Sequence, residues 1–472
     1  MPSLSTRLIV ASVVFSFASP AHAQTDSTLR LSTTNQTAAA EFRAGVNDYQ
    51  NLSFESASSH FKAAITADPK FGLARVLYAG TTFGLDSAKL AGELSRGVAD
   101  AAHGNNKEMI LASAYREAVL GHNDAASALF RAALRLMPND RLVAFAAAGG
   151  VFSATLAAAK ELVARYPDYP LGYNSLAYLS WNAGDRAGAL AAAKRQVELN
   201  PTAPNAHDTY AEILQWSGDL AGAAAEYKQA ATLPPKFPEA FAGQAEVAAL
   251  QGQYDQARAY LDLAITNSWT PAQKLGYMRA IIGTYVLNGG PADALIKQFE
   301  SAIAEAKAEK DTRTTAILYS QLATVQANAG QSTAAHESIA RAKAASADVP
   351  WNVHFYGAMA HGLMKHWAPA RQELTALKDQ AERDESVPSA FVAALEGYQL
   401  TQQGKPADAL PILMAADTTN VLVMNRIAEA HAALGHKAEA AAWNNKINTD
   451  HALNLGDFTN VNSRRRARLA TK

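Results

Sequence analysis

The sequence predicts an all-α chain built from repeated pairs of helices. Glycines recur at Gly184, Gly218 and Gly252, two successive intervals of 34 residues, and Pro201 and Pro235 repeat at the same interval. Each glycine follows an amphipathic stretch and opens a short turn, after which an alanine-rich helical pattern begins. Glycine readily takes the left-handed conformation that ends a helix, so each unit is expected to be a helix–turn–helix hairpin. A period of this length indicates a solenoid of stacked units.

The second helix of each unit carries a small–large–small pattern that ends at proline. The matching sets are Ala57, Phe61, Ala64 and Pro69; Ala126, Phe130, Ala133 and Pro138; and Ala223, Tyr227, Ala230 and Pro235. Small residues let the paired helix approach, the aromatic ring fills the space between hairpins, and proline stops the helix. The pattern therefore predicts helices packed closely through alanine.

These features resemble the tetratricopeptide repeat family, whose pattern joins a first-helix Leu-Gly/Ala pair, a turn glycine and a second-helix Ala–aromatic–Pro set. First-helix pairs occur at Leu176-Ala177, Leu322-Ala323 and Ile427-Ala428. The resemblance extends from about Ala38 to about Asn448 and is strongest over Leu171–Ile265. Weaker units have their turns at Gly289, Gly330, Gly404 and Gly435, and one has Lys365 where glycine is usual. The resemblance implies a right-handed superhelical solenoid of antiparallel helix pairs, with about ten or eleven hairpins.

The N-terminus predicts export. Arg7 precedes an apolar run, Leu8–Ala18, that is too short to span a bilayer. Ala21-His22-Ala23 then offers small residues at a cleavage site before Gln24. Residues 1–23 are therefore expected to be a cleaved signal peptide, with a short anchor helix as the alternative. The mature protein is expected to be periplasmic or secreted.

The rest of the chain is expected to have four segments. These are a disordered mature N-terminus (24–37), an N-terminal array (38–300), a C-terminal array of degenerate repeats (301–448) and a basic, disordered tail (449–472). Two polar stretches, 301–315 and 378–388, interrupt the repeats. Each is either a flexible joint or a lengthened helix facing solvent, and the second is the simpler interpretation.

Composition excludes several classes of protein. The formal net charge of −1 gives no global attraction to nucleic acid. The sequence has no cysteine, so it forms no disulfide, no thiolate-bound metal site and no lipid-modified N-terminal cysteine. The nucleotide-binding pattern G-x-x-x-x-G-K-[ST] and the hydrolase patterns G-x-S-x-G and H-E-x-x-H do not occur. No catalytic residue and no cofactor are expected.

Histidines come closest to a chemical site. His354, His361 and His366 lie in one expected hairpin, and the seven-residue offset puts the first two on one helical face. No carboxylate has matching spacing, and a zinc site needs three or four converging ligands, so ordinary histidines and no bound metal are expected. His207 and Asp208 suggest a catalytic pair, but neighbours on a helix point about 100° apart.

The family resemblance implies that first helices line the concave side of the solenoid and that residues free of hairpin packing contact the ligand. The candidates are Asn174, Tyr178, Trp181, Asn182, Asp208, Glu212, Gln215 and Trp216. Aromatic rings supply contact area and amides bond a peptide backbone. Equally, Trp181 and Trp216 could cover the hairpin ends as core. Because Asp208 and Glu212 would repel a carboxylate, a basic or neutral protein or peptide is the expected partner.

The function expected from these features is a non-catalytic scaffold or chaperone-like module of the periplasm. The alternative is a glycan-cleaving enzyme of the cell envelope built on a helical superhelix. That enzyme would need a separate compact catalytic domain, and too few residues follow Asn448 to form one. The tail carries Arg464, Arg465, Arg466, Arg468 and Lys472, which suit weak contact with an anionic surface. Export makes nucleic acid an unexpected partner.

Overall fold

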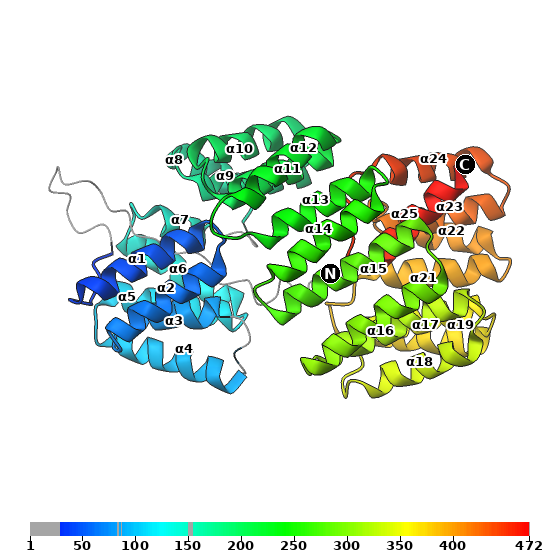
Figure 1. The fold of residues 1–472 in the computed structure, drawn as a ribbon, viewed down its shortest axis with the longest axis horizontal. Coiled ribbons are helices and arrows are strands. Elements are labelled where there is room, and N and C mark those ends of the chain that lie inside the picture. The colour runs from blue at the N-terminus through cyan, green and yellow to red at the C-terminus, as the bar shows by residue number, and fades with distance from the viewer. Residues whose placement is uncertain (1–28, 83–84, 86, 150–153, 472) are drawn as a thin grey trace. The chain divides into compact units, whose positions relative to one another are not determined.

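The computed structural model describes residues 29–82, 85, 87–149 and 154–471, which form two compact units (Figure 1). One unit ends at Gly243 and the other begins at Gln244. The described residues contain 25 α-helices and no strand, so the predicted all-α fold is confirmed. Residues 1–23, the predicted signal peptide, lie outside the described part. Within that part, no helix has the length and apolar character needed to cross a membrane.

The N-terminal unit is a run of helices in which consecutive helices pack on each other from α1 to α7 and again from α8 to α12. Its helices are α1 (Gln36–Gln50), α2 (Phe54–Ala67), α3 (Gly72–Thr81), α4 (Ser87–Ala102), α5 (Asn106–Val119), α6 (Asn123–Leu136), α7 (Arg141–Ala147), α8 (Leu156–Arg165), α9 (Pro170–Asn182), α10 (Arg186–Leu199), α11 (Pro204–Ser217) and α12 (Leu220–Thr232). The division between the units falls within α13 (Pro238–Leu250).

The turn between α11 and α12 shows why a Gly-Asp pair recurs. Gly218 takes a φ of +92°, in the left-handed region, and ends α11. The backbone N–H of Asp219 then donates to the carbonyl of Leu214 (3.0 Å), which satisfies an otherwise unpaired carbonyl at the helix end. The Asp219 carboxylate accepts from the N–H of Gly222 (2.9 Å) and so caps the start of α12. The turn at Gly184 repeats this arrangement.

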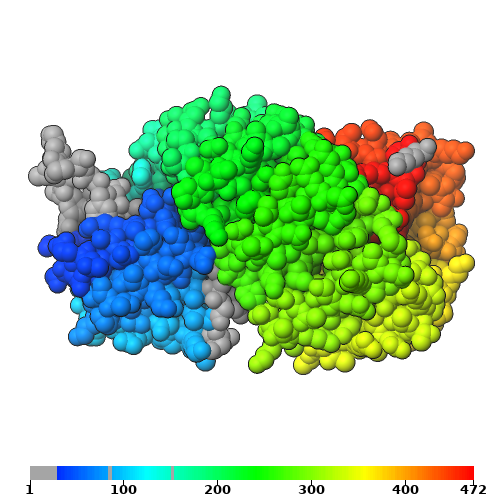
Figure 2. Space-filling model, in the orientation of Figure 1, coloured from blue at the N-terminus to red at the C-terminus, as the bar shows by residue number. Residues whose placement is uncertain are grey.

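The predicted alanine seam is buried. Ala57, Phe61 and Ala64 on α2 are all 0% exposed, and the corresponding residues of α6 and α12 are buried as well. A Cβ on Gly45 of α1 would lie 2.8 Å from the Phe61 ring, so the aromatic side chain fills the space against the first helix. The space-filling view shows side chains closing the gaps that the ribbons leave between helices (Figure 2).

We expect Ala223→Leu to destabilise the N-terminal unit by about 1–3 kcal/mol, because added methylenes have no room in a packed seam. Ala223 is 0% exposed, whereas Ala225 on the same helix is exposed. Urea unfolding followed by circular dichroism measures the effect, with Ala225→Leu as the matched control. Equal unfolding midpoints for the two variants would contradict the assigned register.

The C-terminal unit continues the pattern and adds one helix. Its helices are α14 (Tyr254–Thr266), α15 (Pro271–Asn288), α16 (Ala292–Ala308), α17 (Thr312–Asn328), α18 (Ser332–Ala344), α19 (Trp351–Leu363), α20 (Trp367–Arg383), α21 (Ser389–Gln402), α22 (Pro406–Met414), α23 (Val421–Ala433), α24 (Lys437–Thr449) and α25 (Phe458–Ala470). The last helix packs on α15, α23 and α24 (Figure 1).

The sequence predicts a division of the array at residue 300, whereas the two units of the structure divide between Gly243 and Gln244. The polar stretch 301–315 completes α16 and begins α17, and these two helices pack on each other. Asp311 caps α17 by accepting from the N–H of Thr314 (2.9 Å). Similarly, residues 378–383 extend α20. Most of each stretch is therefore helical, with a turn at residues 309–311 in the first and non-helical residues 384–388 in the second.

Both predictions of terminal disorder need correction within the described residues. Near the N-terminus, Leu29 is only 5% exposed, and the Ser32 hydroxyl donates to the Glu108 carboxylate (2.5 Å). Near the C-terminus, residues 458–470 form α25, and Arg464 within it is 3% exposed. Local polarity suggested solvated ends, but the polar groups are paired with groups far away in the sequence.

Candidate functional site

Two first helices, α9 and α11, carry all eight predicted groove residues and pack against each other. Four of the eight side chains meet there. The Tyr178 hydroxyl donates to the Glu212 carboxylate (2.7 Å). The ring of Trp216 lies 5.9 Å from that of Tyr178 and 5.5 Å from that of Trp181, measured between centroids. We call Tyr178, Trp181, Glu212 and Trp216 the α9–α11 patch.

The patch is neither fully buried core nor a free surface. All four side chains are half-buried, and the three aromatic ones pack over a small core made mainly of alanines. Sequence reasoning left open whether the two tryptophans are core or binding surface. The structure places them at the edge of the core with part of each ring accessible, which is the situation of aromatic anchors at protein interfaces.

Two of the predicted groove residues do not face outward. Asn174 is 1% exposed and donates through Nδ2 to the Thr209 hydroxyl (2.8 Å), which joins α9 to α11. Gln215 is 0% exposed, and its Oε1 accepts from the Tyr227 hydroxyl (3.3 Å). Both amides serve packing between helices, because a buried amide has to find its hydrogen bonds inside the protein. The expectation that they face a partner is corrected accordingly.

The other two residues lie beside the patch. Asn182 is exposed at the end of α9, and Asp208 is half-buried one turn before Glu212 on α11. Burial, followed by the charges of Glu212 and Asp208, raises the pKa of Tyr178 well above its ordinary value. Burial also raises the pKa of Glu212, although the hydrogen bond from Tyr178 opposes this. Tyr178 thus remains a neutral donor beside an acidic face.

Sequence reasoning missed one cation at the patch. The Arg186 guanidinium lies 3.6 Å from the centroid of the Trp181 ring and donates to the backbone carbonyl of Trp181 (2.6 Å). A cation over an aromatic face is favourable and fixes the ring. The signal was present in the sequence: Arg186 follows Trp181 by five residues across the Gly184 turn, a separation that the turn closes in space.

The predicted histidine group divides in two. His354 is hydrogen-bonded to Glu373 (2.8 Å), which also accepts from Lys343. Burial alone would raise the pKa of Glu373, but the hydrogen bonds from these two partners lower it. His354 therefore belongs to an ion-pair cluster. His361 and His366 lie together elsewhere, with a histidine that sequence reasoning did not consider.

His207 does not pair with Asp208. It is hydrogen-bonded to Glu226 on α12 (2.6 Å) and to the carbonyl of Pro201 (2.9 Å), whereas Asp208 points about 100° away around the helix. After Thr449, the residues that the structure describes form the single helix α25 and no further domain. The compact domain that the glycan-cleaving alternative requires is not found in the described residues.

Stacked helix hairpins with left-handed turn glycines, an alanine seam and a 34-residue interval define a helical repeat protein of the tetratricopeptide type. The predicted resemblance to that family is confirmed at the level of the fold. No family model matches the sequence, and no curated protein matches it.

Several solved structures are similar to this chain. The thermophilic tetratricopeptide protein TTC0263 of Thermus thermophilus is 27% identical and covers 36% of this chain and 96% of its own, with a TM-score of 0.32. YrrB, a tetratricopeptide protein with an unusual peptide-binding site, is 16% identical over 41% of this chain and 95% of its own, with a TM-score of 0.28. Human IFIT1, bound to m7Gppp-AAAA, is 14% identical over 90% of this chain and 95% of its own, with a TM-score of 0.45.

These likenesses concern architecture. The ligands that accompany the similar proteins, a peptide site in one and a capped RNA in another, belong to those proteins. The expectation that this chain has no nucleic-acid partner gains no support from the comparisons.

Proposed function

We propose that this chain is an exported, non-catalytic scaffold or chaperone-like module that binds an extended segment of another protein at the α9–α11 patch. The observation that carries the proposal is the cluster of half-buried aromatic rings beside acidic groups on two first helices. Large amphipathic rings supply most of the binding energy at protein interfaces, and their fixed position limits the entropy lost on binding.

The charges of the patch favour a basic partner. Glu212 belongs to it, Asp208 lies one turn away, and the nearby cation Arg186 is already engaged with Trp181. A lysine- or arginine-containing segment would meet opposite charge there, which raises the association rate and penalises acidic partners. Hydrogen-bonding groups at the rim, such as the exposed amide of Asn182, suit a peptide backbone.

Localisation in the periplasm, or secretion, is part of the proposal and rests on the sequence of residues 1–23. Sequencing the N-terminus of the purified mature protein decides this point. A first residue of Gln24 in protein extracted without detergent supports the proposal, whereas an intact Met1 in a membrane fraction contradicts it.

We expect the double variant Asp208→Asn/Glu212→Gln to bind a lysine-rich extended peptide roughly 2- to 30-fold more weakly, because two solvent-screened ion pairs with the peptide are lost. The amide introduced at position 212 keeps an acceptor for the Tyr178 hydroxyl, so the fold is preserved, which a lysine at this half-buried position would not achieve. Tryptophan fluorescence titration measures the affinity, and a glutamate-rich peptide of equal length tests the sign of the charge effect.

The matched control removes two exposed acidic groups from second helices of the same unit, in the variant Glu55→Gln/Glu161→Gln. Its affinity for the lysine-rich peptide should equal that of the unchanged protein. Equal affinities for all three proteins would place the binding surface elsewhere.

A further inference from the structure

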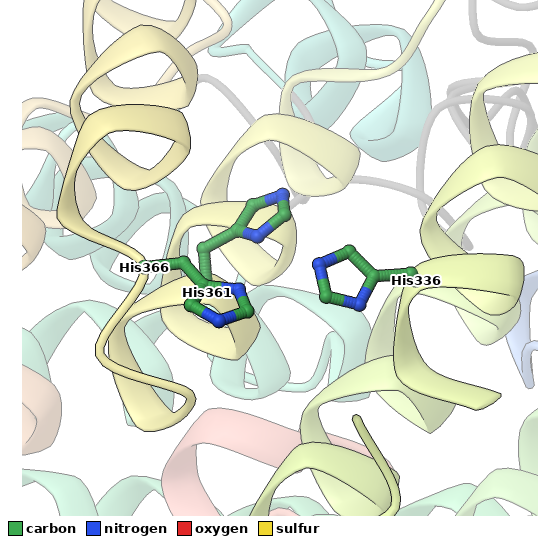
Figure 3. Close-up of side chains that lie close together, drawn as sticks. All are labelled: His336, His361 and His366. Atoms are coloured by element: carbon green, nitrogen blue, oxygen red, sulfur yellow. The ribbon is translucent and has the colours of Figure 1, made fainter. Parts of the chain in front are cut away.

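Three histidines from two neighbouring hairpins converge in the C-terminal unit. His336 lies on α18, His361 lies on α19, and His366 precedes α20 as its N-cap residue. One ring nitrogen of each can be chosen so that all three lie within 4.8 Å of one another. Figure 3 shows the three side chains pointing toward a shared space, His336 from one side and the other two from the opposite side.

The turn after α19 accounts for two of the three. Lys365 takes a left-handed φ of +59°, and the backbone N–H of His366 donates to the carbonyl of His361 (2.8 Å). A hydrogen bond between residues five apart is a common way for a helix to end, and here it brings His361 and His366 close together. The third histidine depends on packing, because α18 belongs to the preceding hairpin.

The distances between the rings are close to those of a metal site. For a tetrahedral ion with Zn–N bonds of about 2 Å, ring centroids should be separated by about 5 Å. The centroid of His336 lies 5.4 Å from that of His361 and 5.2 Å from that of His366. The remaining pair, His361 and His366, is 6.5 Å apart. His366 is exposed, so its side chain has room to rotate toward the other two.

His336 is held in the form that a ligand needs. Its Nδ1 donates to the backbone carbonyl of Ser332 (2.7 Å), so in the neutral ring Nε2 carries the free lone pair. Metal-binding histidines almost always donate their other ring N–H to a carbonyl or carboxylate in this way, which fixes the tautomer and the ring orientation.

His361 supplies an independent indication. His361 is only 7% exposed, and its Nδ1 atom is buried without a hydrogen-bond partner. A buried polar atom without a hydrogen-bond partner is destabilising, so binding of a ligand at this nitrogen would be favourable.

We propose that His336, His361 and His366 bind one divalent transition-metal ion, with solvent in the fourth position. Three imidazoles and no carboxylate suit Zn²⁺, Ni²⁺ or Cu²⁺ and do not suit Ca²⁺ or Mg²⁺, which require oxygen ligands. His336 and His366 are exposed, so water has access to the open position. This inference does not depend on the α9–α11 patch, which lies in the other unit.

The ion would cross-link two hairpins. His336 comes from the α17–α18 pair, whereas His361 and His366 come from the α19–α20 pair. A ligand that binds only the folded state stabilises that state in proportion to its concentration and affinity. The site would thus connect the stability of this part of the solenoid to the supply of metal.

Equilibrium dialysis of the full chain, purified without a histidine tag, tests the proposal with Zn²⁺, Ni²⁺ and Cu²⁺ in separate arms. We expect one ion per chain for at least one of the three. His336→Ala and His366→Ala, at exposed positions that leave the fold intact, should each weaken binding by more than the roughly 10- to 100-fold that loss of an outer-shell partner costs.

The chain contains its own control. His431 and His436 face each other across the equivalent turn, with their Nδ1 atoms 3.3 Å apart. They form a two-histidine pair, since no third histidine, aspartate or glutamate in the described residues joins them as a metal-binding group. The variant His431→Ala/His436→Ala should bind the metal as the unchanged protein does. Loss of binding in this variant, but not in His336→Ala, would overturn the assignment.

A second measurement separates a true three-ligand site from weak surface binding. The metal should raise the melting temperature of the unchanged protein and leave that of His336→Ala unchanged. Tetrahedral coordination should also appear in the visible absorption of the Co²⁺-substituted protein. Absence of a bound ion in all three dialysis arms, or equal affinity in His336→Ala, would refute the proposal.

Discussion

Replacing Arg464 with alanine is expected to lower the free energy of unfolding of the C-terminal unit by about 1–3 kcal/mol, because buried hydrogen-bond acceptors lose their donor. Arg464 is 3% exposed. Its guanidinium donates to the Asp450 carboxylate (2.8 Å) and to the backbone carbonyls of Ala452 (2.9 Å) and Ile447 (3.2 Å). Without the guanidinium, these carbonyls lose their donor, whereas the Asp450 side chain is 33% exposed and keeps access to water.

The effect should extend beyond one residue because α25 packs on α15 as well as on α23 and α24, helices that are far apart in the sequence. Phe458 of this helix packs against Phe299 and Tyr356, with ring centroids 5.6 and 5.8 Å apart. Urea unfolding gives the free energy, and hydrogen exchange of the α25 amides shows whether the helix detaches.

The matched control for this variant is Arg465→Ala. Arg465 is the next residue in the chain and is partly exposed, so its loss should cost less than about 1 kcal/mol. Similar losses of stability for the two variants would mean that Arg464 contributes only its share of surface charge.

The C-terminal helix α25 is an element that the sequence did not predict. A run of arginines near a terminus is typical of a solvated tail, and composition alone favours that interpretation. The difference lies in pairing: Arg464 meets Asp450 and Arg466 meets Glu429, at separations of 14 and 37 residues. Such pairs form only once the hairpins are stacked, so no local pattern reveals them.

The repeat could be predicted from the sequence because the interactions that produce it are local. A turn glycine with positive φ, a capping aspartate and alanines spaced along one helical face all act within a single hairpin, and the structure contains them at Gly184 and Gly218. The candidate site could be predicted from the sequence only in part. Tyr178 and Glu212 meet as the 34-residue register predicts, but the same register placed Asn174 at the surface when it lies inside.

The histidine cluster combines one proximity that is local in the sequence with one that depends on the packing of hairpins. The proximity of His361 and His366 follows from a five-residue separation across a turn, the same relation that unites Trp181 with Arg186. His336 lies in the preceding hairpin, where spacing along the chain carries no information about its distance from the other two. Sequence reasoning therefore considered His354, which shares a helix with His361, and missed His336.

Stability of the N-terminal unit is expected to fall as pH rises from about 4 to about 6, because of the buried Asp140 carboxyl group. Asp140 is 0% exposed at the start of α7. Its Oδ1 accepts from the N–H groups of Leu142 and Val143 (both 3.1 Å), whereas its Oδ2 is buried without a partner. Burial raises the pKa of Asp140 from 3.8 to about 6, although the two hydrogen bonds oppose the shift.

The direction of this pH effect follows from proton binding. Between pH 3.8 and about 6 the folded protein holds a proton on Asp140 that the unfolded chain has released, so raising the pH favours unfolding. A rise in the pKa of Asp140 from 3.8 to about 6 corresponds to roughly 3 kcal/mol of stability at most. Asp140→Asn should remove this pH dependence while keeping the helix cap, since asparagine caps as well as aspartate does. Urea unfolding of both proteins across this pH range measures the difference.

At pH 7–8 the Asn variant should be the more stable by about 1–3 kcal/mol, and at pH 4 the advantage should vanish. If the two stability curves stay parallel over the whole range, the Asp140 carboxyl group titrates near its ordinary pKa and its charge is solvated in the folded protein.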